Sequence, residues 1–210
     1  MNARAAVIVL AAGRGERFLG IAHKLSQPLG GATVLGATLR HAIASQLPVV
    51  VVTTEGLADI ARRSVAARDV IVVPDSNIVA GSGGNVRLGM GHSIASGVSA
   101  RANAGGWLIL PGDMPLVQPA TLVAVANALV HHPVVCAHYK GQRGHPVGFS
   151  AELYSELVML SGDEGARRLV ARYPALGLEL GDPGVLVDVD TVADLAQVRQ
   201  TLGEAPLEVR

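Results

Sequence analysis

The chain has 210 residues, of which 50% are hydrophobic and 3% aromatic, so a sizeable core would be built from alanine, valine, leucine and isoleucine. Its 17 basic and 17 acidic residues balance, which argues against a nucleic-acid partner, since such partners favour a basic surface. The single cysteine, Cys136, excludes an intramolecular disulfide and a multi-cysteine zinc site, and is typical of an intracellular protein. No stretch reaches the roughly 18 uninterrupted apolar residues that a membrane-spanning helix needs.

Short runs rich in β-branched residues alternate with longer segments rich in alanine and leucine. Most of the short runs are apolar throughout, which is typical of strands covered by helices on both faces. Strands are predicted at Ala5–Leu10, Pro48–Thr54, Val70–Pro74, Trp107–Asp113 and Pro133–Tyr139. Helices are predicted at Thr33–Gln46, Leu57–Ala67, Met90–Ala102 and Pro119–His131. This βαβ repetition predicts a doubly wound α/β fold with a mostly parallel sheet.

The second half of the chain is less regular. Its predicted elements are strands at His145–Ser150 and Val185–Asp190 and helices at Ala151–Leu160, within Gly162–Tyr173 and at Thr191–Leu202. Thr191 and Asp194 have the spacing of a capping box at the start of the last helix. Because no linker, repeat or low-complexity block interrupts the chain, a single domain is predicted over residues 1–203, with a tail at 204–210.

Polar residues gather where the predicted strands end. In an open α/β sheet, ligands bind beyond the carboxyl ends of the strands. Four features fall there: the loop after the first strand, a Gly-rich stretch after Pro74, the "GDMP" turn, and the "DVD" sequence that ends at Asp190. Their shared location predicts a binding site at this edge of the sheet.

The sequence "LAAGRGERF", residues 10–18, contains a glycine loop with more than one interpretation. A dinucleotide fingerprint would need a third glycine where Phe18 stands, and a Walker loop would need Gly-Lys-Ser/Thr. A loop whose backbone N–H groups face phosphates fits the remaining pattern, with Arg17 and Lys24 as positive charges. An ordinary turn with solvated charges is the structural alternative.

Acidic residues at two strand ends are candidates for a metal site. Asp113 follows an apolar run, and a carboxylate there suits Mg²⁺, which takes one or two carboxylates together with substrate phosphates. Asp188 and Asp190 alternate along a predicted strand and are not expected to face one site together unless the strand ends between them. Asp190, nearer the strand end, is the better candidate for a metal ligand. Asp188 would either lie next to the metal's ligands without binding the metal itself, or point to the opposite face. A loop or a helix cap is the alternative for Asp113 and Asp190.

Further residues are candidates for contacting substrates. Ser93 and the glycines of "GSGGNVRLGMGHSIASGV" would approach a base or a sugar closely. Candidates for a second substrate lie in "GQRGHPVGFS" and "GDEGAR": Arg143, His145, Pro146, Asp163 and Arg167. The last two are near a helix start, where the helix dipole favours anions. A flexible or solvated loop is the alternative for each segment.

The order of these pieces resembles the MobA-like nucleotidyltransferase family. "LAAGRGERF…K", from Leu10 to Lys24, is similar to the family signature L-A-x-G-x-x-x-R-[FM]-G-x-x-K, with a longer spacing between Arg17 and Lys24. "GMGHSIASG", "GDMP", "GHPV", "GDEGAR" and "DVDT..DL" are similar to later family motifs, in the same order. Six ordered motifs over nearly the whole chain are far more specific than a glycine loop alone.

The resemblance implies a Rossmann-like nucleotidyltransferase fold of the glycosyltransferase-A type, with a nucleotide-binding half at about 1–115 and an acceptor-binding half at about 116–203. Nucleotide contacts are implied for Leu10, Ala11, Ala12, Gly13, Gly15, Arg17, Lys24, Ser93 and Asp113. Acceptor contacts are implied for Arg143, His145, Pro146, Asp163 and Arg167. Mg²⁺, or Mn²⁺ in its place, is implied on Asp113 and Asp190. Arg17 and Lys24 are implied to offset phosphate charge during the reaction.

Within the family, the chain looks closest to the molybdenum cofactor cytidylyltransferases. Guanylyl-transferring relatives carry Leu-Ala-Gly-Gly where this chain has "LAAG", so Ala12 carries the expected base preference. The resemblance then implies transfer of CMP from CTP to the terminal phosphate of molybdopterin, with release of diphosphate. It also implies a cytoplasmic enzyme with transient contact to a molybdenum hydroxylase.

Other functions stay open. A guanylyltransferase would use GTP on the same acceptor, and another cytidylyltransferase would use a sugar phosphate or an isoprenoid precursor. A non-catalytic protein that delivers molybdopterin would not need Lys24, Asp113 and Asp190 together. A dinucleotide-dependent oxidoreductase is disfavoured by Phe18 and by the lack of a ribose-binding acid other than Glu55 after the second strand.

Overall fold

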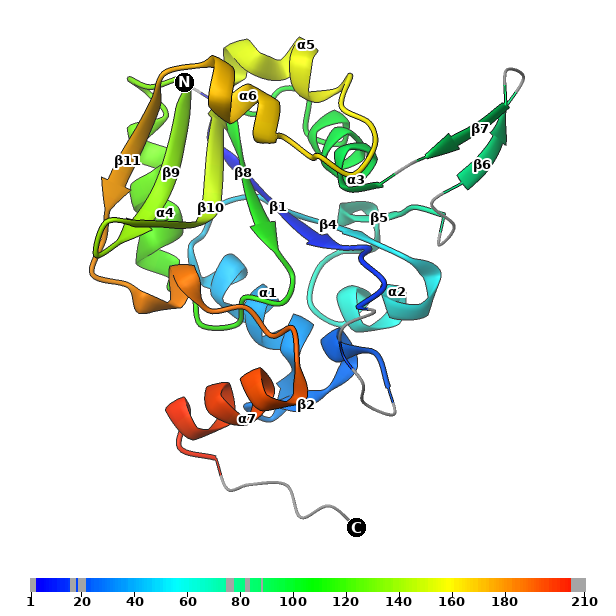
Figure 1. The fold of residues 1–210 in the computed structure, drawn as a ribbon, viewed down its shortest axis with the longest axis vertical. Coiled ribbons are helices and arrows are strands. Elements are labelled where there is room, and N and C mark those ends of the chain that lie inside the picture. Colours follow the sequence, from blue (N-terminus) through cyan, green and yellow to red (C-terminus); the bar gives the residue numbers. More distant parts are fainter. Residues whose placement is uncertain are drawn as a thin grey trace.

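The computed structural model describes residues 3–15, 18, 22–74, 78–81, 84–87 and 89–204. A seven-stranded sheet runs through it in the order β11-β9-β10-β8-β1-β4-β5 (Figure 1). Its strands are β1 (Ala6–Ala11), β4 (Val49–Thr53), β5 (Val70–Val72), β8 (Gly106–Pro111), β9 (Val134–Tyr139), β10 (Gln142–Ser150) and β11 (Ala175–Glu179). β10 pairs antiparallel with β8 and β9, and every other pairing in this sheet is parallel. The predicted α/β fold with a mostly parallel sheet is confirmed.

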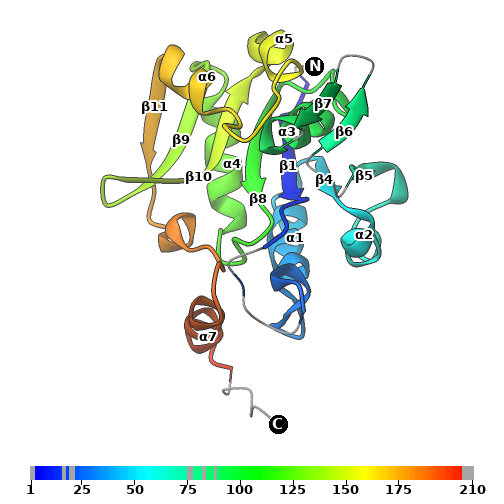
Figure 2. The same cartoon turned by 45° about the vertical axis from the view of Figure 1, so that its right-hand side comes forward.

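Helices cover both faces of the sheet, as the two views in Figures 1 and 2 show. They are α1 (Val34–Ala44), α2 (Glu55–Arg62), α3 (Gly89–Ser99), α4 (Pro119–Ala128), α5 (Tyr154–Leu157), α6 (Arg167–Arg172) and α7 (Val192–Thr201). α1, α2, α4 and α7 contribute to one apolar core, and α3, α5 and α6 contribute to the other. In the part of the chain that the structure describes, no helix is long and apolar enough to cross a membrane.

The first strand shows why its sequence is apolar throughout. Val7 and Val9 point into the core under α1, α2 and α4, whereas Ala6 and Ile8 point into the core under α3. All four side chains are fully buried. Burying a valine or isoleucine stabilises a protein by about 1.5–3 kcal/mol. If every second residue of β1 were polar, one face of the strand would lose this stabilisation.

Two short hairpins lie outside the main sheet. β2 (Pro28–Leu29) pairs with β3 (Ala32–Thr33), and β6 (Ile78–Gly81) pairs with β7 (Gly84–Arg87). The second hairpin extends away from the sheet beyond α3 (Figure 1). Four 3₁₀ helices complete the described elements: η1 (Lys24–Ser26), η2 (Ala67–Asp69), η3 (Ala151–Leu153) and η4 (Pro183–Leu186).

The main differences from the predictions lie in the second half. The strand predicted at Val185–Asp190 is wrong, because the chain forms η4 and then continues without strand pairing among the described residues. Asp182 favours this turn, since its carboxylate accepts a hydrogen bond from the Gly184 N–H at 2.9 Å and Pro183 follows it. Strand β11 was not predicted, because as an edge strand it alternates exposed and half-buried residues instead of forming an apolar run.

The capping box predicted at the start of α7 is confirmed. The Thr191 hydroxyl accepts from the Asp194 N–H at 3.2 Å, and Asp194 Oδ2 accepts from the Thr191 N–H at 2.7 Å. Asp194 Oδ2 also accepts from the Asp190 N–H at 3.1 Å. Hydrogen bonds from the Thr191 side chain and from the backbone hold the pKa of Asp194 below its usual value. The cap therefore fixes the backbone at Asp190.

Two helical glycines provide a matched stability test of the packing between α3 and the sheet. A Cβ on Gly97 would collide with the Ile8 Cγ2 methyl and lie 2.9 Å from that of Val52, whereas one on Gly56 would have no heavy atom within 4 Å. Gly97→Ala is therefore expected to lower the free energy of unfolding by about 1–3 kcal/mol. Gly56→Ala is expected to raise it by up to about 1 kcal/mol. Urea unfolding of both variants measures this, and equal shifts would contradict the packing.

Candidate active site

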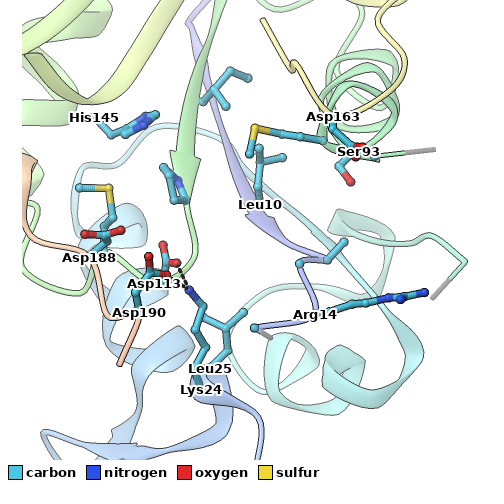
Figure 3. Close-up of a pocket in the computed structure, with 18 of the residues that line it drawn as sticks. Leu10, Arg14, Lys24, Leu25, Ser93, Asp113, His145, Asp163, Asp188 and Asp190 are labelled. Atoms are coloured by element: carbon cyan, nitrogen blue, oxygen red, sulfur yellow. Dashed lines mark hydrogen bonds and ion pairs between the residues drawn. The ribbon is translucent and has the colours of Figure 1, made fainter. Parts of the chain in front are cut away.

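A cavity of about 760 Å³ opens at the edge of the sheet where β1 and β8 end (Figure 3). Leu10 and Pro111, near the carboxyl ends of these strands, form part of its wall. Because β10 is antiparallel to β8, its first residues, Arg143–His145, reach the same edge. The cavity therefore lies where an open α/β sheet places its ligands.

The cavity gathers most of the predicted site residues. Those in its wall are Leu10, Ala12, Gly13, Gly15, Lys24, Ser93, Asp113, Arg143, His145, Asp163, Asp188 and Asp190. Ala11 and Pro146 are buried in the protein, and Arg167 is exposed at the start of α6; none of the three lies in the described wall. Arg17 is outside the described residues.

The wall also contains side chains that the sequence reasoning did not select, among them Arg14, Met90 and His92. Arg14 stands between Gly13 and Gly15, and the other two lie within the "GMGH" sequence. The glycines of these loops predicted backbone contacts with a ligand. The residues next to those glycines also line the cavity.

Lys24 joins two carboxylates at the floor of the cavity. Its Nζ lies 2.6 Å from Asp113 Oδ2 and 2.6 Å from Asp190 Oδ1, as the dashed contacts in Figure 3 indicate. The side chains of Lys24, Asp113 and Asp190 are only 11%, 15% and 18% exposed. Water therefore screens both ion pairs of Lys24 weakly. Burial disfavours the charged ammonium, but the charge of Asp113 and hydrogen bonds to both carboxylates outweigh it and raise the pKa of Lys24. Lys24 is therefore a permanent cation.

Backbone hydrogen bonds hold Asp113 in place. The Gly112 N–H donates to the Leu10 carbonyl at 2.8 Å, and the Thr38 hydroxyl donates to the Gly112 carbonyl at 2.9 Å. The Val189 N–H donates to the Asp113 carbonyl at 2.9 Å. The "GDMP" turn is thus tied to β1, to α1 and to the "DVD" segment, which brings Asp190 beside it.

Asp188 and Asp190 both line the cavity, and the segment that carries them is not a strand, so the expectation that a continuous strand would keep them apart is wrong. Residues two apart on an extended chain point to the same side, so even a strand here would bring both carboxylates to one face. Burial and the nearby charges of Asp190 and Asp113 raise the pKa of Asp188. Two carboxylates therefore contact the ammonium and a third lines the same cavity, which leaves this part of the cavity attractive to a further cation.

The described residues fit a divalent cation in part. Asp113 Oδ1 is buried and has no hydrogen-bond partner within the described part of the chain. An ionised carboxylate oxygen only accepts, so a cation would satisfy it. Among those same residues, no group of three or more His, Cys, Asp or Glu side chains is arranged to hold a metal ion. A metal here would need oxygen ligands from a substrate, as Mg²⁺ commonly does.

The opposite wall is formed by two motifs that pack against each other. The Gly91 N–H donates to the Gly162 carbonyl at 2.8 Å, and a Cβ on Gly91 would lie 2.7 Å from the Ser161 nitrogen. A Cβ on Gly89 would collide with the Gly162 backbone. The start of α3 can therefore approach the "GDEGAR" loop only with glycines at these positions, and this contact brings Ser93 and Asp163 to one wall.

His145 is a largely buried group on the third wall. Burial lowers the pKa of His145 despite opposing contributions from a backbone hydrogen bond with Ile109 and from the charge of Asp113. Its Nδ1 is buried and has no hydrogen-bond partner among the residues described. The imidazole is therefore neutral at neutral pH and retains one nitrogen for a further hydrogen bond.

The lowered pKa of His145 predicts a loss of stability on acidification. The unfolded chain, with the ordinary value of 6.5, takes up the proton before the folded protein does. The stability that the neutral His145 ring contributes is fully present above about pH 6.5. It is lost as the pH falls from 6.5 towards the lower pKa that His145 has in the folded protein. Urea midpoints measured between pH 7.5 and 5 should fall less steeply for His145→Gln than for the wild type. His131→Gln, at an exposed position, is the control and should keep the wild-type slope; equal slopes for both variants would contradict the prediction.

Known proteins resemble this chain in sequence. PucB of Bacillus subtilis, described as a purine catabolism protein, is 30% identical over 207 residues that cover 93% of this chain and 96% of PucB. GlmU of Dinoroseobacter shibae, a bifunctional protein, is 38% identical over 125 residues, and the match spans only 26% of its length. The chain thus spans about a quarter of the GlmU relatives that it matches.

Solved structures show the same architecture. The crystal structure of Rv0371c from Mycobacterium tuberculosis superposes with a TM-score of 0.77 at 30% identity, covering 95% of this chain and 100% of that one. A second structure of Rv0371c, in complex with manganese, gives a TM-score of 0.74 at 29% identity, with 94% and 99% covered. The architecture and the site define a nucleotidyltransferase. The chain belongs to the MobA-like NTP transferase family, whose domain matches residues 7–176.

Proposed function

We propose that this nucleotidyltransferase moves CMP from CTP to the terminal phosphate of molybdopterin and releases diphosphate. The observation that carries the proposal is the Lys24 ammonium held between Asp113 and Asp190, at the floor of a cavity whose rim is a glycine loop. Both reactants are anions, so their approach requires positive charge and fixed positions more than covalent participation by the protein. The described residues supply these two requirements at one place.

The nucleotide end of the cavity is the loop from Ala12 to Gly15. Backbone N–H groups of such a loop bind phosphate oxygens, and Gly15, with φ of 64°, adopts the left-handed conformation that such loops use. The cavity volume of about 760 Å³ falls in the upper part of the range for small-molecule sites, which suits two substrates side by side. Arg17 is proposed as a further phosphate ligand.

In the proposed reaction, a phosphate oxygen of the acceptor attacks the α-phosphorus of CTP, and the bond to the β-phosphate breaks. The attacking phosphate is already ionised near neutral pH, so no general base is required. Lys24, a permanent cation, offsets charge on the phosphates as diphosphate leaves. Its two carboxylate contacts hold the ammonium in position before the substrates arrive.

A divalent cation is part of the proposal. Asp113 and Asp190 would hold it, with Asp188 beside them and phosphate oxygens completing its ligands. When bound, Mg²⁺ or Mn²⁺ would neutralise phosphate charge. The unpartnered Oδ1 of Asp113 supports this assignment, and so does the manganese complex of the related Rv0371c.

The acceptor is proposed to lie against the wall formed by Arg143, His145 and Asp163. Arg143 offers charge, and the neutral His145 ring offers a nitrogen for hydrogen bonding. Pro146 and Arg167 do not reach this wall in the described structure, so they are proposed to act only through their neighbours. The name of PucB supports a setting in purine catabolism. Transient delivery of the product to a molybdenum hydroxylase in the cytoplasm is proposed on the family resemblance alone.

The nucleotide preference can be tested at Ala12. Ala12 lines the cavity, and its methyl group is proposed to limit the space for a larger purine base. Diphosphate release should be at least about tenfold faster with CTP than with GTP when molybdopterin is the acceptor, because one filled pocket position discriminates by roughly 10–200-fold. Ala12→Gly should narrow this ratio.

Sugar phosphates and methylerythritol phosphate serve as competing acceptors in the same assay. If diphosphate is released faster with one of these acceptors than with molybdopterin, that acceptor replaces molybdopterin in the proposal. A ratio above one for GTP over CTP would favour a guanylyltransferase. Mg²⁺-independent CTP binding without any diphosphate release would favour a delivery protein.

Asp113→Asn tests the charge arrangement. Asparagine keeps the shape of the side chain, and Lys24 keeps Asp190 as a partner, so no buried charge is left alone and the fold should persist. Diphosphate release should fall by about 10²-fold or more, because the proposed divalent cation loses a charged ligand and Lys24 loses one of the two carboxylates that position it. Asp59→Asn, on the exposed face of α2, is the matched control. Near-normal turnover of Asp113→Asn with an unchanged melting temperature would refute the role of Asp113.

A further inference from the structure

His23 links the glycine loop to the segment that carries Lys24. Its Nε2 lies 2.9 Å from the Gly13 carbonyl oxygen, and its Nδ1 lies 3.2 Å from the Leu25 nitrogen. A backbone N–H only donates, so Nδ1 accepts from Leu25 and carries no hydrogen. The hydrogen of the neutral ring is then on Nε2, which donates to the Gly13 carbonyl. The network thus assigns one tautomer and uses both ring nitrogens.

The backbone of His23 is also fixed. Its carbonyl accepts from the Ser26 N–H at 2.9 Å and from the Ser26 hydroxyl at 2.7 Å. His23 is the residue that caps η1, the 3₁₀ turn whose first residue is Lys24. Because Lys24 is anchored to Asp113 and Asp190 at the floor of the cavity, the His23 ring extends from a rigid base.

His23 contacts the loop from outside the cavity. Gly13, Arg14 and Gly15 line the cavity, whereas His23 is not among the described residues of the wall. In a trans peptide the carbonyl and the following N–H point in opposite directions. With the Gly13 carbonyl bound to His23, the Arg14 N–H of the same peptide is directed away from the ring.

The loop needs such an external contact. A Cβ on Gly13 would have no heavy atom within 4 Å, so side-chain packing does little to fix the loop at that residue. A Cβ on Gly15, which has a positive φ, would lie 3.3 Å from Lys24 Cγ and 3.5 Å from His23 Nε2, so the loop packs against the segment that carries Lys24. The connection from Arg17 to Lys24 is also longer than the family signature has. The hydrogen bond between His23 and Gly13 therefore joins the glycine loop directly to the segment that carries Lys24, across this longer connection.

We infer that His23 is a positioning residue, which holds the glycine loop in the conformation that receives the triphosphate. The inference rests on the proposed function, because it takes the loop as the triphosphate site. His23 itself touches neither substrate. Its effect passes through the orientation of the peptide between Gly13 and Arg14.

Two substitutions separate the loop contact from the cap. In His23→Asn, the amide oxygen takes the place of Nδ1 and can still cap Leu25, but the side chain is too short to reach Gly13. In His23→Gln, the longer side chain can place its amide nitrogen where Nε2 lies, and the cap is lost. His131→Asn, at an exposed position, controls for the loss of an imidazole elsewhere.

The first measurement is amide hydrogen exchange in the protein without nucleotide. The amides of residues 13–15 should exchange about five- to tenfold faster in His23→Asn than in the wild type or in His23→Gln, because one hydrogen bond that orders the loop is absent. The melting temperature of His23→Asn should stay at the wild-type value. Equal exchange in all three proteins would overturn the inference, whatever the reaction.

The second measurement is CTP binding and turnover with Mg²⁺. His23→Asn should raise the KM for CTP about five- to tenfold with little change in kcat, and His23→Gln should restore it. A wild-type KM in His23→Asn, or an equal defect in both variants, would contradict the positioning role. A wild-type protein that binds neither CTP nor GTP would refute the proposed function separately, because the exchange result does not depend on any nucleotide.

Discussion

The structure depends on the ammonium of Lys24, which lies between the carboxylates of Asp113 and Asp190. These three residues come from distant parts of the chain, and each is fixed by its own local device: a 3₁₀ turn capped by His23, a turn tied to β1, and the capping box of α7. Burying a charge is costly unless its partners compensate for the loss of hydration, and the raised pKa of Lys24 indicates that the two carboxylates do so for the ammonium. The floor of the cavity is thus held together by the attraction between one ammonium and two carboxylates.

Much of the fold could be predicted because double coverage of a parallel sheet leaves a clear mark on the sequence. The strands β1, β4, β5, β8 and β9 are apolar runs in the sequence. The predicted ends of each lie within about two residues of the observed ends. The failures occur where that mark is absent. β11 lies at the edge with alternate residues exposed. The apolar residues from Val185 to Val189 pack on the core through η4 and the segment after it, with no strand pairing in the described part of the chain.

The membership of the candidate site could be predicted better than its geometry. Strand ends and glycine motifs pointed to Asp113, Asp190 and Ser93, because these motifs are local in the sequence. The packing of "GMG" on "GDEGAR", the ion pairs of Lys24 and the contact of His23 with Gly13 join residues that are distant along the chain or lie in a loop without periodicity. Such contacts arise from tertiary packing, and no single-sequence pattern encodes them.

The reversed direction of β10 has a consequence for how this architecture can diversify. The half of the cavity proposed for the nucleotide is built on parallel strands and their following loops, whereas the half proposed for the acceptor begins at the β9–β10 hairpin, whose turn at Lys140 and Gly141 adopts positive φ angles. The far end of β10, at Phe149, is anchored in the core. Changes in the length or residues of that hairpin can therefore reshape one half of the cavity while the other half keeps its framework, so a new acceptor can be acquired without a new nucleotide site.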